Sequence, residues 1–69
     1  MPLSLLGPGN GGRIRRISGS GDVRRFLGNL GFVEGMDVSV ISDIGGNVIV
    51  SLLDSRVAIN REMASHIYV

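Results

Sequence analysis

From residue 36 onwards, hydrophobic and polar residues alternate along the chain with a period of two. The alternation starts at Met36, Val38 and Val40, breaks at the turn sequence GGN over 45–47, and resumes over 48–52. Successive residues of a strand face opposite sides of a sheet, and a glycine-rich turn between two alternating segments is typical of a β-hairpin. The pattern therefore predicts a hairpin in this part of the chain.

Two shorter elements and a helical turn are predicted after the hairpin. A second turn at 54–55 leads into a short strand over 56–59. Asn60 is a suitable N-cap for a helical turn over 61–65, because its side-chain oxygen can accept a backbone N–H. The chain is then expected to end in a strand over 66–69.

Before residue 36 the pattern predicts one irregular strand and one helix. Ile14 and Ile17 are three residues apart, which breaks strict alternation and indicates a bulged or twisted strand. One helical face is predicted from four apolar residues at the spacing i, i+3, i+4 and i+7: Val23, Phe26, Leu27 and Leu30.

The ends of this helix are marked by residues that favour helix termini. Asp22 is expected to cap its start, and Gly31 to end it in a left-handed conformation. Gly28 within the helix is unfavourable, which suggests that the helix packs closely on another segment there.

The predicted elements add up to five short strands, with one helix between the first and second and a helical turn before the last. Five such strands are too few for two packed sheets, whereas a small, strongly bent barrel lets them share one core. We therefore expect a mostly-β fold, a small five-stranded barrel that forms a single domain over residues 1–69.

Composition is that of a small globular protein without disulfides. With 43% hydrophobic and 19% charged residues, the chain is not of the disordered class. It has no cysteine, which excludes a disulfide framework, a thiolate metal site and a cysteine nucleophile. No apolar run approaches the roughly 20 residues of a membrane span, and the start MPLSLLGPG lacks a basic segment. We expect an unprocessed cytoplasmic protein that does not insert into a membrane.

No motif in the sequence supports catalysis. The segment GPGNGGRI over 7–14 is similar to a phosphate-binding loop, but Arg13 and Ile14 replace its lysine and its hydroxyl residue. No nucleophile-elbow motif is present, and His66 is the only histidine available as a base. We therefore assign no catalytic residue and expect a protein that is not an enzyme.

Metal ligands are sparse. His66 and Glu62 are four residues apart and would face the same side of a helix, which makes them weak candidates for contact with a divalent cation. A metal site normally needs three or four ligands, and no cluster of that size is present. No cofactor is expected, although weak binding of Fe²⁺ or another divalent ion stays open.

The basic residues are all arginines, and five of the seven lie between residues 13 and 25. These five could contact phosphates in a small nucleic-acid-binding barrel: Arg13, Arg15, Arg16, Arg24 and Arg25. Six acidic residues nearly balance the arginines, and few aromatic residues are available to stack on bases. A solvated face is the simpler interpretation, and no nucleic acid is expected.

Surplus apolar residues give the clearest physical indication of function. Ile49, Leu53 and Tyr68 fall on the outward phase of their strands, and Phe32 and Val33 follow the helix. If some of them cluster, they would form a patch of the kind that marks a protein interface. The sequence thus favours a docking module over a catalyst.

The order of these motifs resembles the FeoA family of bacterial ferrous iron uptake. The resemblance covers nearly the whole chain, from Leu3, Leu6 and Gly9 to Ala64, Ile67 and Val69. Its most diagnostic part is LGFVEG over 30–35, which is similar to the family's L-G-[LIMF]-x-P-G turn. Glu34 stands in place of the family's usual proline, and Asn60 stands where leucine is common.

The resemblance implies an SH3-like barrel and an accessory role beside FeoB, a membrane transporter with a cytoplasmic GTP-binding domain. It also implies transition metal ion binding, for which this sequence offers no site. The expected function is a non-enzymatic adaptor that docks on the transporter's GTP-binding or membrane domain and regulates it. The residues expected to make the contact are Phe32, Val33, Leu53, Arg24 and Arg25.

Two other functions stay open at this stage. A nucleic-acid-binding barrel would use the arginines between 13 and 25, and a ferrous-ion sensor would depend on His66. The sequence leaves undecided whether docking activates or restrains the transporter, and whether the protein self-associates.

Overall fold

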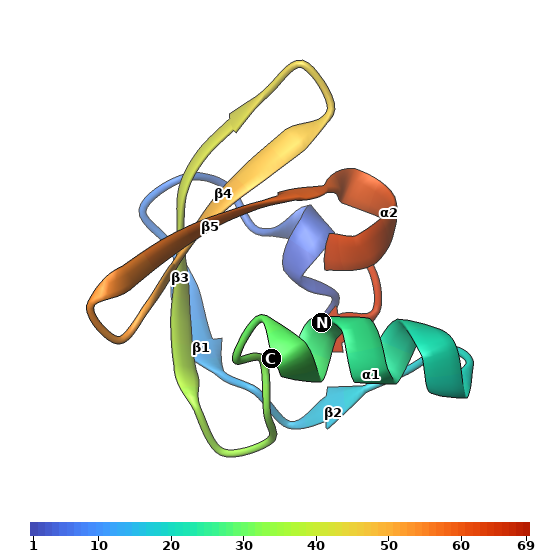
Figure 1. Cartoon of the computed structure of the whole chain (residues 1–69). Coiled ribbons are helices and arrows are strands. Elements are labelled where there is room, and N and C mark those ends of the chain that lie inside the picture. Colours follow the sequence, from blue (N-terminus) through green and yellow to red (C-terminus); the bar gives the residue numbers. More distant parts are fainter.

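The computed structural model describes residues 1–69 and contains six strands, two α-helices and one short 3₁₀-helix (Figure 1). In chain order the elements are η1 (Leu3–Leu5), β1 (Gly11–Arg13), β2 (Arg16–Ile17), α1 (Gly21–Asn29), β3 (Asp37–Ile44), β4 (Asn47–Leu52), β5 (Ser55–Asn60), α2 (Arg61–Ala64) and β6 (Ile67–Tyr68).

The strands form two antiparallel sheets. Four of them lie in the order β1-β3-β4-β5, and β2 pairs with β6 in a separate two-stranded sheet. The mostly-β fold and the helix before the long hairpin are as predicted, but a closed five-stranded barrel is not. There are six strands, and β5 has a strand neighbour on one side only.

The division into two sheets explains the irregular strand that was predicted around Ile14 and Ile17. Ile14 donates its N–H to the carbonyl of Met36, whereas Arg15 donates to the carbonyl of Tyr68. The backbone therefore changes partner from one sheet to the other between two successive residues. The single bulged strand of the sequence interpretation is in fact two strands, β1 and β2.

The predicted hairpin is confirmed. Strands β3 and β4 pair up to Ile44 and Asn47 around the turn Gly45-Gly46, with a register shift between Val40 and Ser42. The next turn comes one residue earlier than predicted. It consists of Leu53 and Asp54, because Leu52 pairs with Ser55.

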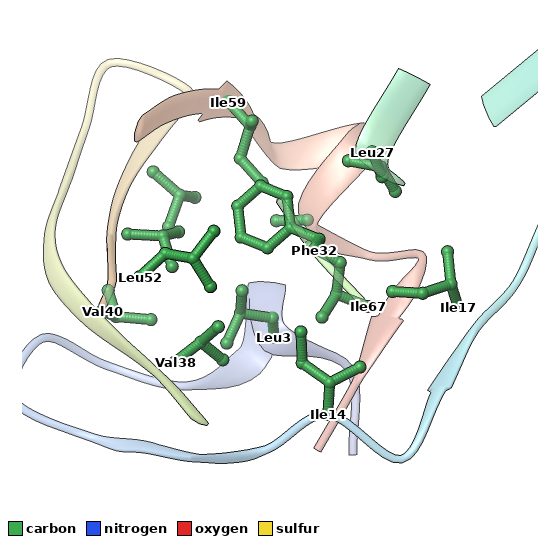
Figure 2. Close-up of a cluster of buried hydrophobic side chains, with 13 residues drawn as sticks. Leu3, Ile14, Ile17, Leu27, Phe32, Val38, Val40, Leu52, Ile59 and Ile67 are labelled. Carbon is green, nitrogen blue, oxygen red and sulfur yellow. The ribbon is translucent and has the colours of Figure 1, made fainter. Parts of the chain in front are cut away.

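One hydrophobic cluster fills the space between the sheets and the helices (Figure 2). Its thirteen buried residues are Leu3, Ile14, Ile17, Leu27, Phe32, Val38, Val40, Val48, Val50, Leu52, Ile59, Ala64 and Ile67. They come from every part of the chain, and no polar side chain is buried with them. The inward residues of β3 and β4 are those that the period-two pattern places on one face.

Helix α1 starts two residues earlier than expected. Ser20, not Asp22, is its N-cap, and the Ser20 hydroxyl accepts the N–H of Val23 at 3.3 Å. Asp22 lies in the first turn, where its carboxylate pairs with Arg25 at 3.0 Å. A serine in this position satisfies one of the free N–H groups that open a helix.

The end of α1 determines the position of Phe32. Gly31 has a φ of 105° and ends the helix as predicted. The N–H of Gly31 bonds to the carbonyl of Gly28, and the N–H of Phe32 to that of Leu27. This is the Schellman arrangement, in which the residue after the terminator contacts the helix's last turn. Phe32 is accordingly 1% exposed and belongs to the core, as Leu27 does.

Helix α1 is in close contact with the sheet at Gly31, at the C-terminal end of the helix, and not at Gly28. A Cβ atom added to Gly28 would have no neighbour within 4 Å, so the prediction of close packing at this residue is wrong. A Cβ atom added to Gly31 would lie 2.8 Å from Cδ2 of Leu52. The glycine that permits close contact is therefore the terminator.

The C-terminal segment closes the molecule. Asn60 caps α2 as predicted, and its Oδ1 accepts the N–H of Met63 at 2.7 Å. The final strand β6 covers two residues, with Ile67 buried and Val69 only half-buried. The amino group of Met1 donates to the carbonyl of Val69 at 2.9 Å, so the two ends meet (Figure 1). None of the helices has the length and hydropathy needed to cross a membrane.

Candidate protein-interaction surface

The five residues predicted to contact a partner lie in different elements, and one of them is buried. Arg24 and Arg25 are exposed on α1, Val33 is exposed in the loop after it, and Leu53 is exposed in the β4–β5 turn. Phe32 cannot belong to a surface, because the Schellman turn directs it into the core. Its prediction as a contact residue is wrong.

An exposed aromatic residue on α1 was missed. Phe26 was expected in the core, yet 47% of it is exposed. The helix places Val23 and Leu30 within about 60° of Leu27 but places Phe26 about 100° away, because successive residues are separated by roughly 100°. The same arithmetic applied to the sequence would have placed Phe26 at the border of the buried face.

Leu53 differs from the other exposed apolar residues in its exposure and its backbone conformation. It is 77% exposed, more than any other large hydrophobic residue of the chain. Its φ is 54°, and it is the only non-glycine residue with a positive φ. A left-handed backbone conformation costs a residue with a side chain about 1–2 kcal/mol.

An open cleft of about 300 Å³ lies beside Leu53 on the outer face of the sheet. It is lined by Asp37, Val38, Ser39, Ser51 and Leu53. The serines are cross-strand partners in β3 and β4, which places their hydroxyls next to each other. The cleft thus joins two hydroxyls and a carboxylate to one exposed leucine.

The Asp37 carboxylate in this cleft is held only weakly. Its nearest cation is Arg13, with 3.6 Å between the carboxylate oxygen and Nε. The side chains of Asp37 and Arg13 are 81% and 73% exposed, so water screens the pair. The carboxylate can therefore exchange Arg13 for another cation at little cost.

The arginines between 13 and 25 do not form one basic face with free side chains. Arg13 pairs with Asp37 and Arg25 with Asp22. Arg16 lies over the ring of Tyr68, 4.4 Å from its centroid, because these residues are partners in the β2–β6 pair. Only Arg15 and Arg24 of this group have no acidic or aromatic partner.

The two weak metal candidates are not joined by further ligands. Nδ1 of His66 lies 3.1 Å from the hydroxyl of Ser18, a bond that links the end of α2 to the residue after β2. Nowhere does the structure bring together three His, Cys, Asp or Glu side chains in a way that could hold an ion. The fold thus gives His66 a structural contact and no ligand cluster.

Comparisons with known proteins point to one family. A family model described as the FeoA domain matches residues 1–69. A FeoA iron uptake regulatory protein of known crystal structure is 31% identical, with a TM-score of 0.89, and the match covers 97% of this chain and 89% of that chain. The FeoA of Stenotrophomonas maltophilia, a procaryotic SH3 domain protein complexed with zinc, is 26% identical with a TM-score of 0.83, over 99% of this chain and 87% of that chain.

The fold also occurs as part of a larger protein. A manganese-dependent transcriptional repressor matches all of this chain over 40% of its own, with a TM-score of 0.91 and 21% identity. At this identity the likeness concerns the fold alone. Curated protein sequences give no significant match. The family model and the FeoA structures confirm the resemblance, and the chain belongs to the FeoA family of small, mostly-β proteins of ferrous iron transport.

Proposed function

We propose that the protein is a non-enzymatic accessory protein of ferrous iron uptake, which docks on the cytoplasmic side of a FeoB-type transporter and modulates it. The observation that carries this proposal is the FeoA family match over all 69 residues. The iron uptake role of the 31% identical relative supports it. Exposed apolar side chains outside the core give the protein the means to bind another protein.

The contact residues are proposed from exposure and charge. Val33 and Leu53 would lose water on binding, which favours association by burial of apolar surface. Arg24, which has no acidic partner, and Arg25, whose pair with Asp22 is exposed, would steer the protein towards an acidic surface. Val33 lies in the loop after α1 and Leu53 in the β4–β5 turn, and both are exposed.

A two-dimensional NMR titration tests this proposal. Isotope-labelled protein is mixed with the soluble cytoplasmic domain of the transporter, with and without guanine nucleotide, and with the full transporter in nanodiscs. We expect chemical shift changes confined to exposed residues such as Val33 and Leu53, and none at buried residues such as Val50. Absence of any change with the full transporter would rule the proposal out.

A direct role of a metal ion is the second candidate, because the relative from Stenotrophomonas maltophilia was solved with zinc. In this chain the candidate ligands are His66, the only histidine, and Glu62, the nearest carboxylate in sequence. Anaerobic titration with Fe²⁺ or Zn²⁺ should show stoichiometric binding that is lost in His66→Gln if this candidate is correct. Equal behaviour of both proteins would exclude His66 as a ligand.

A further inference from the structure

The four-stranded sheet contains two hairpins, and their turns place different residues at positions of positive φ. Each has a two-residue turn, between Ile44 and Asn47 in one case and between Leu52 and Ser55 in the other. In the first turn the positive φ angles of 61° and 82° belong to Gly45 and Gly46. In the second turn a positive φ of 54° belongs to Leu53.

The turn itself does not require a leucine at this position. Glycine adopts a positive φ freely, and asparagine adopts it with less strain than other residues. The first hairpin of this same chain shows that glycine satisfies such a turn. Leu53 therefore adds strain to the backbone that a glycine would avoid.

The core does not require the leucine either. With 77% of its surface exposed, Leu53 is not among the thirteen buried residues. Backbone strain at an exposed residue is retained where the side chain serves a purpose other than folding. An apolar side chain raised at the tip of a turn is suited to enter an apolar pocket on another protein.

The cleft beside Leu53 indicates the chemistry of the partner. Its polar lining residues are Asp37, Ser39 and Ser51. A lysine or arginine side chain would fit this lining, because the carboxylate and both hydroxyls can accept its hydrogen bonds. Because the pair between Asp37 and Arg13 is exposed and weak, Asp37 can exchange Arg13 for such a cation.

We propose that Leu53 and this cleft form one docking site in two parts, which takes a protein segment that presents a basic side chain next to an apolar socket. The socket receives Leu53, and the basic side chain enters the cleft and pairs with Asp37. In taking the iron transporter as the protein that carries this segment, the inference rests on the proposed function.

The test measures binding and stability of the same variants. Leu53→Gly removes the side chain and relieves the backbone, while Ile44→Ser removes an equally exposed residue, 75% in the wild type, from the other hairpin. Full transporter in nanodiscs is titrated with each protein. We expect Leu53→Gly to be at least as thermally stable as the wild type, because the backbone strain is relieved, and to bind at least about tenfold more weakly, the loss of one buried leucine. Ile44→Ser should bind as the wild type does.

The polar part of the site is tested with Asp37→Asn. This variant should also bind more weakly, and its binding should depend less on salt than that of the wild type, since one charge pair is gone. Unchanged binding of Leu53→Gly overturns the docking site, and so does a marked loss of its stability, because the leucine would then serve the fold. Failure of the wild type itself to bind the transporter overturns the proposed function and this partner with it.

Discussion

At the scale of single residues, Gly31 is constrained in two separate ways. Its φ is 105°, and an added Cβ atom would lie 2.8 Å from the buried side chain of Leu52. Gly35 has a similar φ of 91°, but a Cβ atom there would meet nothing within 4 Å. A side chain at Gly35 would therefore introduce backbone strain alone, whereas a side chain at Gly31 would introduce both backbone strain and steric overlap.

We expect Gly31→Ala to lower the free energy of unfolding by about 2–5 kcal/mol, the sum of backbone strain and overpacking. Gly35→Ala should lower it by only about 1–2 kcal/mol, from the backbone alone. Denaturant unfolding followed by circular dichroism measures both values. Equal losses in the two variants would mean that Leu52 moves aside without cost.

Substitution of Gly28 should have the opposite sign. This glycine lies inside α1, and an added Cβ atom would point into open space. Gly28→Ala should therefore raise the free energy of unfolding by up to about 1 kcal/mol, because alanine loses less backbone entropy in a helix. The same unfolding experiment measures this change in free energy. A destabilised variant would contradict the expectation and support the close packing at Gly28 that the sequence suggested.

At the scale of elements, the start of α1 depends on Ser20. Ser20→Ala removes the hydroxyl that accepts the Val23 N–H and should lower the free energy of unfolding by about 1 kcal/mol. Asp22→Ala removes the exposed pair with Arg25 and a carboxylate from the first turn, each worth a few tenths of a kcal/mol. Thermal unfolding of both variants compares these effects, and a larger loss for Asp22→Ala would place the cap where the sequence suggested it.

How far the sequence predicts each element depends on how local its determinants are. The hairpin from β3 to β4 was predicted within a residue, because alternation and a glycine turn are local features. The two phenylalanines were assigned to the wrong sides. Phe26 lies at the border of the helix face, and Phe32 is directed inward by the hydrogen bonds of the Schellman turn. Such bonds depend on backbone geometry that an apolar pattern does not contain.

The candidate site was predictable in part for the same reason. The outward position of Leu53 followed from strand phase, and the structure confirms its exposure. Its positive φ did not follow, because the sequence suggested a turn one residue later. The cleft required the pairing of Ser39 with Ser51 across two strands, and pairing across strands is a tertiary feature.

At the scale of the whole molecule, Arg61 connects three parts of the chain. Its guanidinium donates to the carbonyl of Ser4 at 3.1 Å and to the carboxylate of Asp43. It thereby joins α2 to η1 and to β3. The Asp43 side chain is 17% exposed, so solvent screens this pair less than the other two ion pairs.

Arg61→Gln should lower the free energy of unfolding by about 1–2 kcal/mol, since it weakens bonds of a charged group to two elements. Arg25→Gln is the matched control and should change it by less than about 1 kcal/mol, because its pair is exposed and within one helix. Denaturant unfolding compares the two variants. Equal effects would show that Arg61 contributes no more than a surface ion pair.

The meeting of the two ends makes the chain almost a closed ring. Besides the bond between Met1 and Val69, Pro2 forms a β-bridge with Tyr68. A short glycine linker from residue 69 to residue 1, with new ends between Gly45 and Gly46, should therefore give a circular permutant that folds, since every core contact is kept. Its NMR spectrum would show whether the fold is retained. The same geometry would let a host protein carry this domain as an insertion in one of its own loops, with both junctions at one point and its own fold undisturbed.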